Sequence, residues 1–95
     1  MSDTVNALNG QAMSCAQAGD IRGAIDNWKK ALQINPGDGH IKHNLCVSYY
    51  NLAAEAIRRG DVSGAHGEIC TALSYDPLDS QARQLQMDII RAPRR

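Results

Sequence analysis

The sequence contains no phenylalanine among its 95 residues, and aromatic residues make up only 4% of it. Because β-sandwich cores rely on aromatic and β-branched side chains, this shortage argues against a β-sandwich. An excess of one charge is also missing, since ten Lys and Arg residues balance ten Asp and Glu residues. Nucleic-acid-binding domains normally carry a basic excess, so the composition predicts no nucleic-acid partner.

Long apolar runs are lacking as well. No stretch approaches the roughly 18 apolar residues that mark a membrane-spanning helix, so no membrane partner is expected. The first residues do not show the basic region and apolar stretch of a signal peptide. Cys15, Cys46 and Cys70 are odd in number and widely spaced, which does not suit a disulfide framework. Together these features predict a reduced, cytoplasmic protein.

Alanine is abundant by contrast, with 13 residues, and it favours the helix more than any other residue. A hydrophobic content of 43% does not suit a disordered chain. The length permits a single domain over residues 1–95, whose core leaves little room for an enclosed active site. We therefore expect an all-α domain that is not an enzyme and holds no cofactor.

The sequence repeats itself after a shift of 41 residues. Residues 19–38 read GDIRGAIDNWKKALQINPGD and residues 60–79 read GDVSGAHGEICTALSYDPLD, with eight of 20 positions identical and no gap. A fixed internal period in this range is the signature of a repeat architecture. Two similar structural units are therefore expected.

Each copy predicts one helix with marked ends. Asp20 and Asp61 follow a glycine and are candidate N-caps, because a carboxylate accepts hydrogen bonds from the free N–H groups of a first turn. Apolar residues recur behind them at helical spacing. Pro36 and Pro77 then end the helices, and the residue before each proline is biased away from the helical region.

Three more helices are expected outside the two copies, joined to them by short turns as helical hairpins. The first ends at Gly19, the second covers 41–59 without glycine or proline, and the third covers 80–91 before Pro93. The helix over 41–59 carries an apolar stripe made of Ile41, Leu45, Tyr49, Leu52 and Ala56.

Two glycines fall inside the second copy's helix. Gly64 and Gly67 each cost about 1 kcal/mol there relative to alanine. The sequence leaves two explanations open: close packing against the helix 41–59, or a pliable helix at a partner surface.

These features resemble the tetratricopeptide repeat, a helix pair of about 34 residues. The family prefers small residues where the paired helices approach, one large apolar residue between them, and a proline at the end. The residues at these places are Ala12, Ala24, Trp28, Ala31 and Pro36 in the first repeat and Ala65, Ile69, Ala72 and Pro77 in the second.

The resemblance implies a short α-solenoid of two repeats, about 5–38 and 39–79, followed by a terminal helix over 80–91. The spacing exceeds that of the family by seven residues, which are about two helical turns and rotate a face by only ~20°. We place these turns in the helix 41–59, which should project past its partner helix and expose Tyr50, Leu52 and Ala53.

The resemblance also implies a function, which is to bind a peptide or helix of a partner protein on the concave helical surface. The residues at the binding places are Asn6, Asn9, Met13, Ala16 and Gln17 from the first repeat and His40, His43, Val47, Tyr50 and Asn51 from the second. Some family members hold a C-terminal carboxylate with a lysine and an asparagine. Asn9 and Met13 stand at those places here, so we expect neither that clamp nor a strongly acidic ligand.

A metal- or cofactor-carrying helical protein is the alternative. His40 and His43 share one helical face, within reach of one metal ion. Cys46 is rotated by roughly 120° from His40, so all three would not easily meet one ion. The two histidines would then need other protein residues to complete the metal site, and His66 is a less favoured candidate. No CxxC or HExxH motif accompanies them.

Self-association is expected as well. Two repeats and one terminal helix are near the lower limit for a stable solenoid, because each unit needs a neighbour. Met87 lies about 160° round its helix from Leu85, so one packing surface cannot cover both. The sequence therefore predicts a homodimer, or a monomer that is stable only with its partner.

Overall fold

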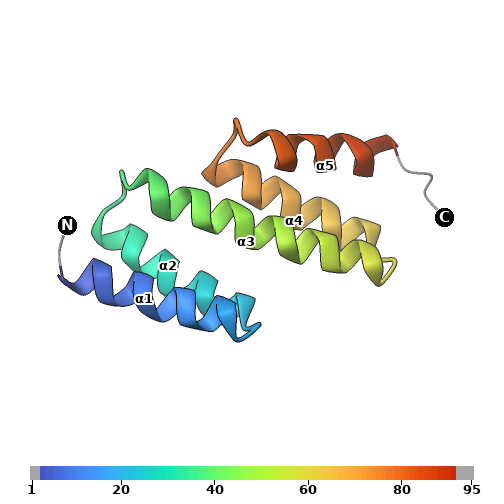
Figure 1. Cartoon of the computed structure of the whole chain (residues 1–95). Helices are drawn as coiled ribbons and strands as arrows, with labels where there is room; N and C mark the ends of the chain where they lie inside the picture. The colour runs from blue at the N-terminus through green and yellow to red at the C-terminus, as the bar shows by residue number, and fades with distance from the viewer. Residues whose placement is uncertain (1–2, 92–95) are drawn as a thin grey trace. The chain divides into compact units, whose positions relative to one another are not determined.

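The computed structural model describes residues 3–91, and within that range it contains helices and no strands. The elements are α1 (Asp3–Gln17), α2 (Ile21–Ile34), α3 (Gly39–Arg58), α4 (Val62–Tyr75) and α5 (Ser80–Arg91), shown in Figure 1. The all-α prediction is confirmed, as are the five expected helices. Pro93 and the basic residues Arg94 and Arg95 lie outside the described residues.

The chain separates into two compact units, with the boundary between Leu45 and Cys46. Because this boundary lies inside α3, the first unit holds α1, α2 and the beginning of α3. The second unit holds the rest of α3 together with α4 and α5. A single domain over residues 1–95 stays a prediction.

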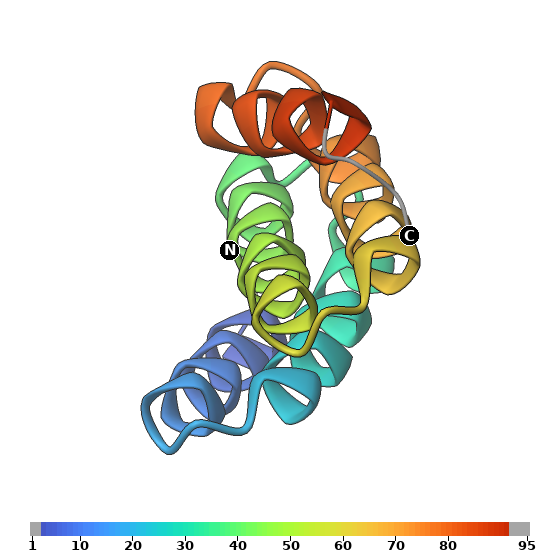
Figure 2. The same cartoon turned by 90° about the vertical axis from the view of Figure 1, so that its right-hand side faces the viewer.

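In the first unit, α1 and α2 lie side by side as a helical hairpin, visible in both ribbon views (Figures 1 and 2). Trp28 is only 5% exposed, and its indole Nε1 donates a hydrogen bond to Asn9 Oδ1 at 2.9 Å. Ala12, Ala24 and Ala31 are fully buried, as expected of small residues at places of close helix approach. The predicted role of Trp28 as a buried spacer is confirmed.

The turns that end α1 and α3 have the same hydrogen-bond pattern. Gly19 and Gly60 adopt φ values of +86° and +80°, a left-handed conformation that glycine reaches without steric cost. The amide of Asp20 donates to the carbonyl of Cys15 at 2.8 Å, and Gly19 donates to Ala16 at 3.1 Å. This pair of bonds is a Schellman motif, which satisfies carbonyls that the helix end leaves free. Gly60 forms the same motif at the end of α3.

The helices that follow these turns begin at aspartate caps. Asp20 Oδ1 accepts from the amide of Gly23 at 3.0 Å, and Asp61 Oδ1 accepts from Gly64 at 2.8 Å. A Cβ atom on either glycine would collide with the capping carboxylate. Both glycines therefore leave room for the cap.

In the second unit, α3 and α4 contact each other through stacked tyrosines, and α4 packs against α5. The rings of Tyr49 and Tyr75 lie 6.0 Å apart, with 13° between their planes. Ile69, at the large-residue place of the second repeat, is fully buried. Leu52 and Ala53 are also buried, so the expectation that the lengthened helix exposes them was wrong. Tyr50 is half-buried.

Of the two explanations left open for the glycines of α4, close packing against α3 does not hold for Gly67. A Cβ atom at Gly67 would meet nothing within 4 Å, and one at Gly64 would meet the Asp61 carboxylate from its own helix cap. The close neighbour of Gly64 is thus local, and Gly67 has open space where a side chain would stand.

We predict that Trp28→Ala lowers the free energy of unfolding by about 3–5 kcal/mol, because it leaves a cavity and an unpaired Asn9 carbonyl. That loss is comparable to the whole stability of a small domain. Urea unfolding followed by circular dichroism measures it, with Ile34→Ala as a control because Ile34 is 50% exposed. A wild-type tryptophan emission as red-shifted and quenchable as that of free indole would contradict the buried placement.

Alanine substitutions at the two glycines of α4 should have different effects on the free energy of unfolding. Gly67→Ala should raise the free energy of unfolding by about 0.5–1 kcal/mol, because it gains helix propensity at a site with room. Gly64→Ala gains the same propensity but displaces a cap worth about 1 kcal/mol, so its net effect should be zero or destabilising. Equal stabilisation by both substitutions in denaturant titrations would show that the Asp61 cap contributes little.

Candidate functional site

The binding residues expected in the first unit lie mostly in solvent. Asn6, Ala16 and Gln17 on α1 are exposed, and so are His40 and His43 on α3. Met13 is 49% exposed. Asn9 differs, since it is half-buried and its Oδ1 accepts the Trp28 indole bond, while its Nδ2 lies 3.8 Å from Met13 Sδ. Asn9 therefore supports the hairpin as well as facing the expected surface.

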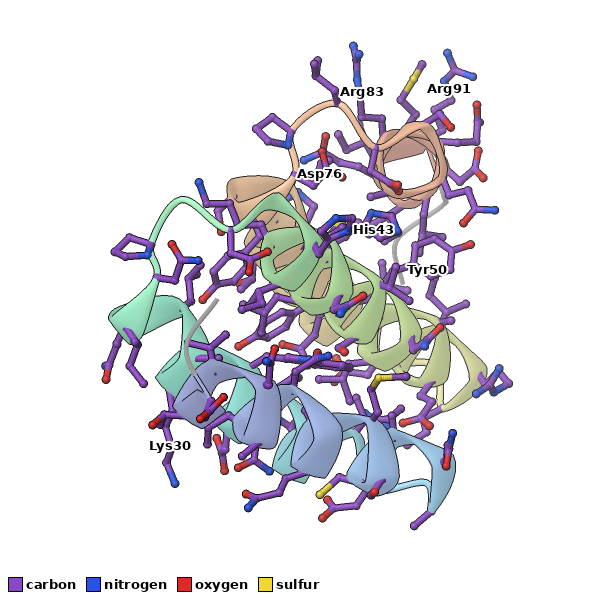
Figure 3. The ribbon with its side chains drawn as sticks, turned by 60° about the vertical axis from the view of Figure 1, so that its left-hand side comes forward. Lys30, His43, Tyr50, Asp76, Arg83 and Arg91 are labelled. Carbon is purple, nitrogen blue, oxygen red and sulfur yellow. The ribbon has the colours of Figure 1, made fainter. Side chains whose placement is uncertain are left out.

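One of the binding residues expected in the second unit, Tyr50, lines a hollow. Val47 and Asn51 are exposed on α3, and Tyr50 forms part of the wall of an open hollow of about 250 Å³. Figure 3 labels Tyr50 on the side of α3 that is turned towards α5. The other lining residues all come from α5, and they are Ser80, Gln81, Gln84, Leu85 and Asp88.

The contribution of α5 to this hollow was missed by the sequence reasoning, which treated 80–91 only as a terminal helix. Asp79 is equivalent to Asp38, and each caps the helix that follows it. Counting a third repeat from Ser80 places Gln81, Gln84 and Asp88 at its second, fifth and ninth residues, which are binding places in the repeat pattern. The signal was therefore present in the spacing after Pro77.

The hollow offers hydrogen-bonding groups around an apolar side chain. Gln84 Nε2 donates to Asp88 Oδ1 at 3.0 Å, which fixes these two side chains one turn apart on α5. Among the described residues that line the hollow, only Asp88 carries a charge. A strongly acidic ligand would meet this carboxylate unfavourably, which agrees with the ligand class expected from the sequence.

The structure weakens the case for Cys46 as a metal ligand. Its thiol is fully buried, and burial, followed by the charges of Asp79 and Asp76, raises its pKa from 9.0 to about 11. Because the side chain of Cys46 is 0% exposed, an ion in solution does not reach its sulfur. Cys46 instead fills a place in the core, where a free cysteine behaves as a small hydrophobe.

The remaining cysteines lie in different surroundings. Cys15 is half-buried, with its sulfur 3.8 Å from Asn27 Nδ2, and Cys70 is exposed on α4. All three cysteines of the described chain are free thiols. Within residues 3–91, no helix combines the length and the apolar character needed to cross a membrane.

Comparison with known proteins agrees with this architecture. Residues 5–38 match the family described as tetratricopeptide repeat. The BBSome complex member bbs-4 of Caenorhabditis elegans is 31% identical over 68 residues, which cover 72% of this chain. The chain spans only 13% of the length of that relative. The match begins in α1 and ends at the cap of α3, so the first helical hairpin of this chain is identified as a tetratricopeptide repeat, and the all-α architecture agrees with that family.

Proposed function

We propose that this protein is a non-catalytic adaptor that binds a peptide or helix of a partner protein on the exposed sides of α3 and α5 in the second unit. The binding residues expected on α1 stay a prediction for the first unit. The observation that carries the proposal is the hollow beside Tyr50. It is lined by α5 residues that stand at binding places of the repeat pattern. Tetratricopeptide repeats are in general protein-interaction modules, which supports the proposal at the level of the family.

The chemistry of the hollow suits a polypeptide ligand. Gln81 and Gln84 offer amide groups that can pair with a backbone, and Ser80 adds a hydroxyl group. Tyr50 contributes an amphipathic ring of the kind that is enriched in protein interfaces. Because the hollow is open and holds a single carboxylate, we propose a neutral or mildly basic segment as its ligand.

The setting of this adaptor is also a proposal. The similar protein bbs-4 is named as a member of the BBSome complex, and we propose that the present chain likewise contacts a subunit of a protein assembly. The free cysteines support a reducing, cytoplasmic location. Neither a cofactor nor a nucleic-acid partner is part of the proposal.

A second copy of the chain is the other candidate partner. Five large apolar side chains of the second unit are exposed, and three of them lie on α5 or in the turn before it: Leu78 at 81%, Ile90 at 57% and Met87 at 44%. Met87 and Ile90 lie on α5, away from the buried Ala82 and Ile89. Apolar groups gathered on one helix favour association in water, and this supports a homodimer formed through α5.

We predict that replacing Tyr50 and His43 by alanine weakens partner capture and shifts the melting temperature by only a few degrees, because neither side chain is fully buried. A photo-crosslinking amino acid in place of Tyr50 should capture the same partner from cell extract. The matched control is Lys30→Ala with Ile34→Ala, which removes two exposed side chains of α2. A large loss of stability in the first double variant would mean that these are core residues and that the binding surface lies elsewhere.

We predict a homodimer in sedimentation equilibrium at micromolar concentration. Met87→Glu together with Ile90→Glu should produce a monomer, because two buried carboxylates would oppose the apolar contact. Ile34→Glu, on the first unit, should leave the dimer intact. A wild-type chain that is monomeric and also melts cooperatively would exclude self-association.

A further inference from the structure

Outside the expected binding surface, α4 brings a thiol and an imidazole together. His66 and Cys70 are four residues apart, so they lie on the same face of the helix. Cys70 Sγ lies 3.9 Å from both ring nitrogens of His66. Cys70 is exposed and His66 is half-buried, so ions in solution reach both side chains.

This separation is close to the one that two ligands of a tetrahedral ion adopt. With Zn–S near 2.3 Å and Zn–N near 2.0–2.1 Å, the sulfur and nitrogen ligands of one zinc ion lie roughly 3.6 Å apart. The sulfur is equally far from the two nitrogens, so neither nitrogen is singled out as its partner. A rotation of the imidazole about its Cβ–Cγ bond turns one nitrogen lone pair towards an ion beside the sulfur.

A third polar group comes from α5. Gln86 Nε2 lies 3.7 Å from Cys70 Sγ, in the same unit of the chain. The amide of glutamine presents either its nitrogen or its oxygen after a half-turn, and the oxygen accepts a cation. Water can occupy the remaining coordination position on this exposed face.

We propose that His66 and Cys70 form a clamp for a thiophilic divalent cation such as Zn²⁺, with Gln86 as a neighbouring oxygen donor. Binding replaces the thiol proton, which passes to solvent, by a sulfur–metal bond. No electron transfer is involved. This clamp is distinct from the series His40, His43 and Cys46, whose cysteine is buried. Its two main ligands lie on α4, and Gln86 on α5 is not among the residues that line the hollow beside Tyr50, so the clamp does not depend on the proposed adaptor function.

The test is a titration of the reduced, full chain with Cd²⁺, a spectroscopically visible substitute for Zn²⁺. Wild type should develop a saturable thiolate-to-cadmium absorption band with one ion per chain. Cys70→Ser should abolish the band, and Cys15→Ser, the matched control, should leave it unchanged. His66→Ala should weaken binding by about tenfold or more, since losing even an outer partner of a ligand has an effect of that size. Thermal melts of each apo variant establish that the fold is retained.

Protection of the thiol gives a second readout. Zn²⁺ should slow the alkylation of Cys70 by iodoacetamide in wild type, whereas it should have little effect on that rate in His66→Ala. The proposal is overturned if wild type shows no sulfur–metal band, if Cys70→Ser retains it, or if His66→Ala binds Cd²⁺ as tightly as wild type. A smaller loss in Gln86→Ala than in His66→Ala supports the assignment of Gln86 as the weaker donor, and an equal or larger loss contradicts it.

Discussion

The geometry of this protein depends on carboxylates that cap the starts of its helices. Every helix after α1 begins with an aspartate whose side chain accepts from a backbone amide of the first turn, at distances between 2.8 and 3.2 Å; these residues are Asp20, Asp38, Asp61 and Asp79. A cap of this kind contributes about 1 kcal/mol. Its larger effect is to define the residue at which the helix starts. A glycine or proline lies within two residues before each cap and leaves a turn of only a few residues, so the helix must restart at one defined residue. The side of each helix that becomes buried follows from that starting point.

The lengthened helix α3 shows how the same side of a helix stays buried although residues have been added. It has 20 residues, whereas α1 contributes 13 when counted from the start of the repeat at residue 5 to its end at residue 17, so the difference is seven. Seven residues fit as about two turns, with a drift of only ~20°. The apolar stripe of α3 accordingly remains buried from one end to the other, and its members are Ile41, Leu45, Tyr49, Leu52 and Ala56. An insertion of five residues would rotate the second half of the helix by about 140° and turn this stripe towards solvent. Seven is therefore a length that the repeat accommodates without changing its core.

Local signals were sufficient to predict the helix ends and the small-residue places, because glycine, proline, aspartate and alanine act there within one or two turns of chain. The errors concern contacts between segments distant in sequence. The bond from Trp28 to Asn9 spans 19 residues, and no periodicity reveals that a residue of the expected binding surface is also a hydrogen-bond acceptor for the core. Likewise, Leu52 and Ala53 looked uncovered because the pattern gives the length of α3 and not the neighbours along it. The hollow beside Tyr50 required α5 to be placed, although the spacing from Asp79 already indicated which of its residues stand at binding places.

Burial separates the chemistry of residues that look equivalent in the sequence. Cys46 has histidines three and six residues before it and was the obvious candidate for metal chemistry, yet its side chain is fully buried, and burial, followed by the charges of Asp79 and Asp76, raises the pKa of its thiol to about 11. Cys70 attracts no attention in the sequence, but it is exposed, and one helical turn brings the imidazole of His66 to 3.9 Å from its sulfur. The difference arises because a small core must be filled at every small-residue place. A cysteine at such a place serves packing, whereas one on the outer side of a helix keeps its reactivity. In a chain with so little interior, groups that act on other molecules must therefore come from the exposed sides of its helices.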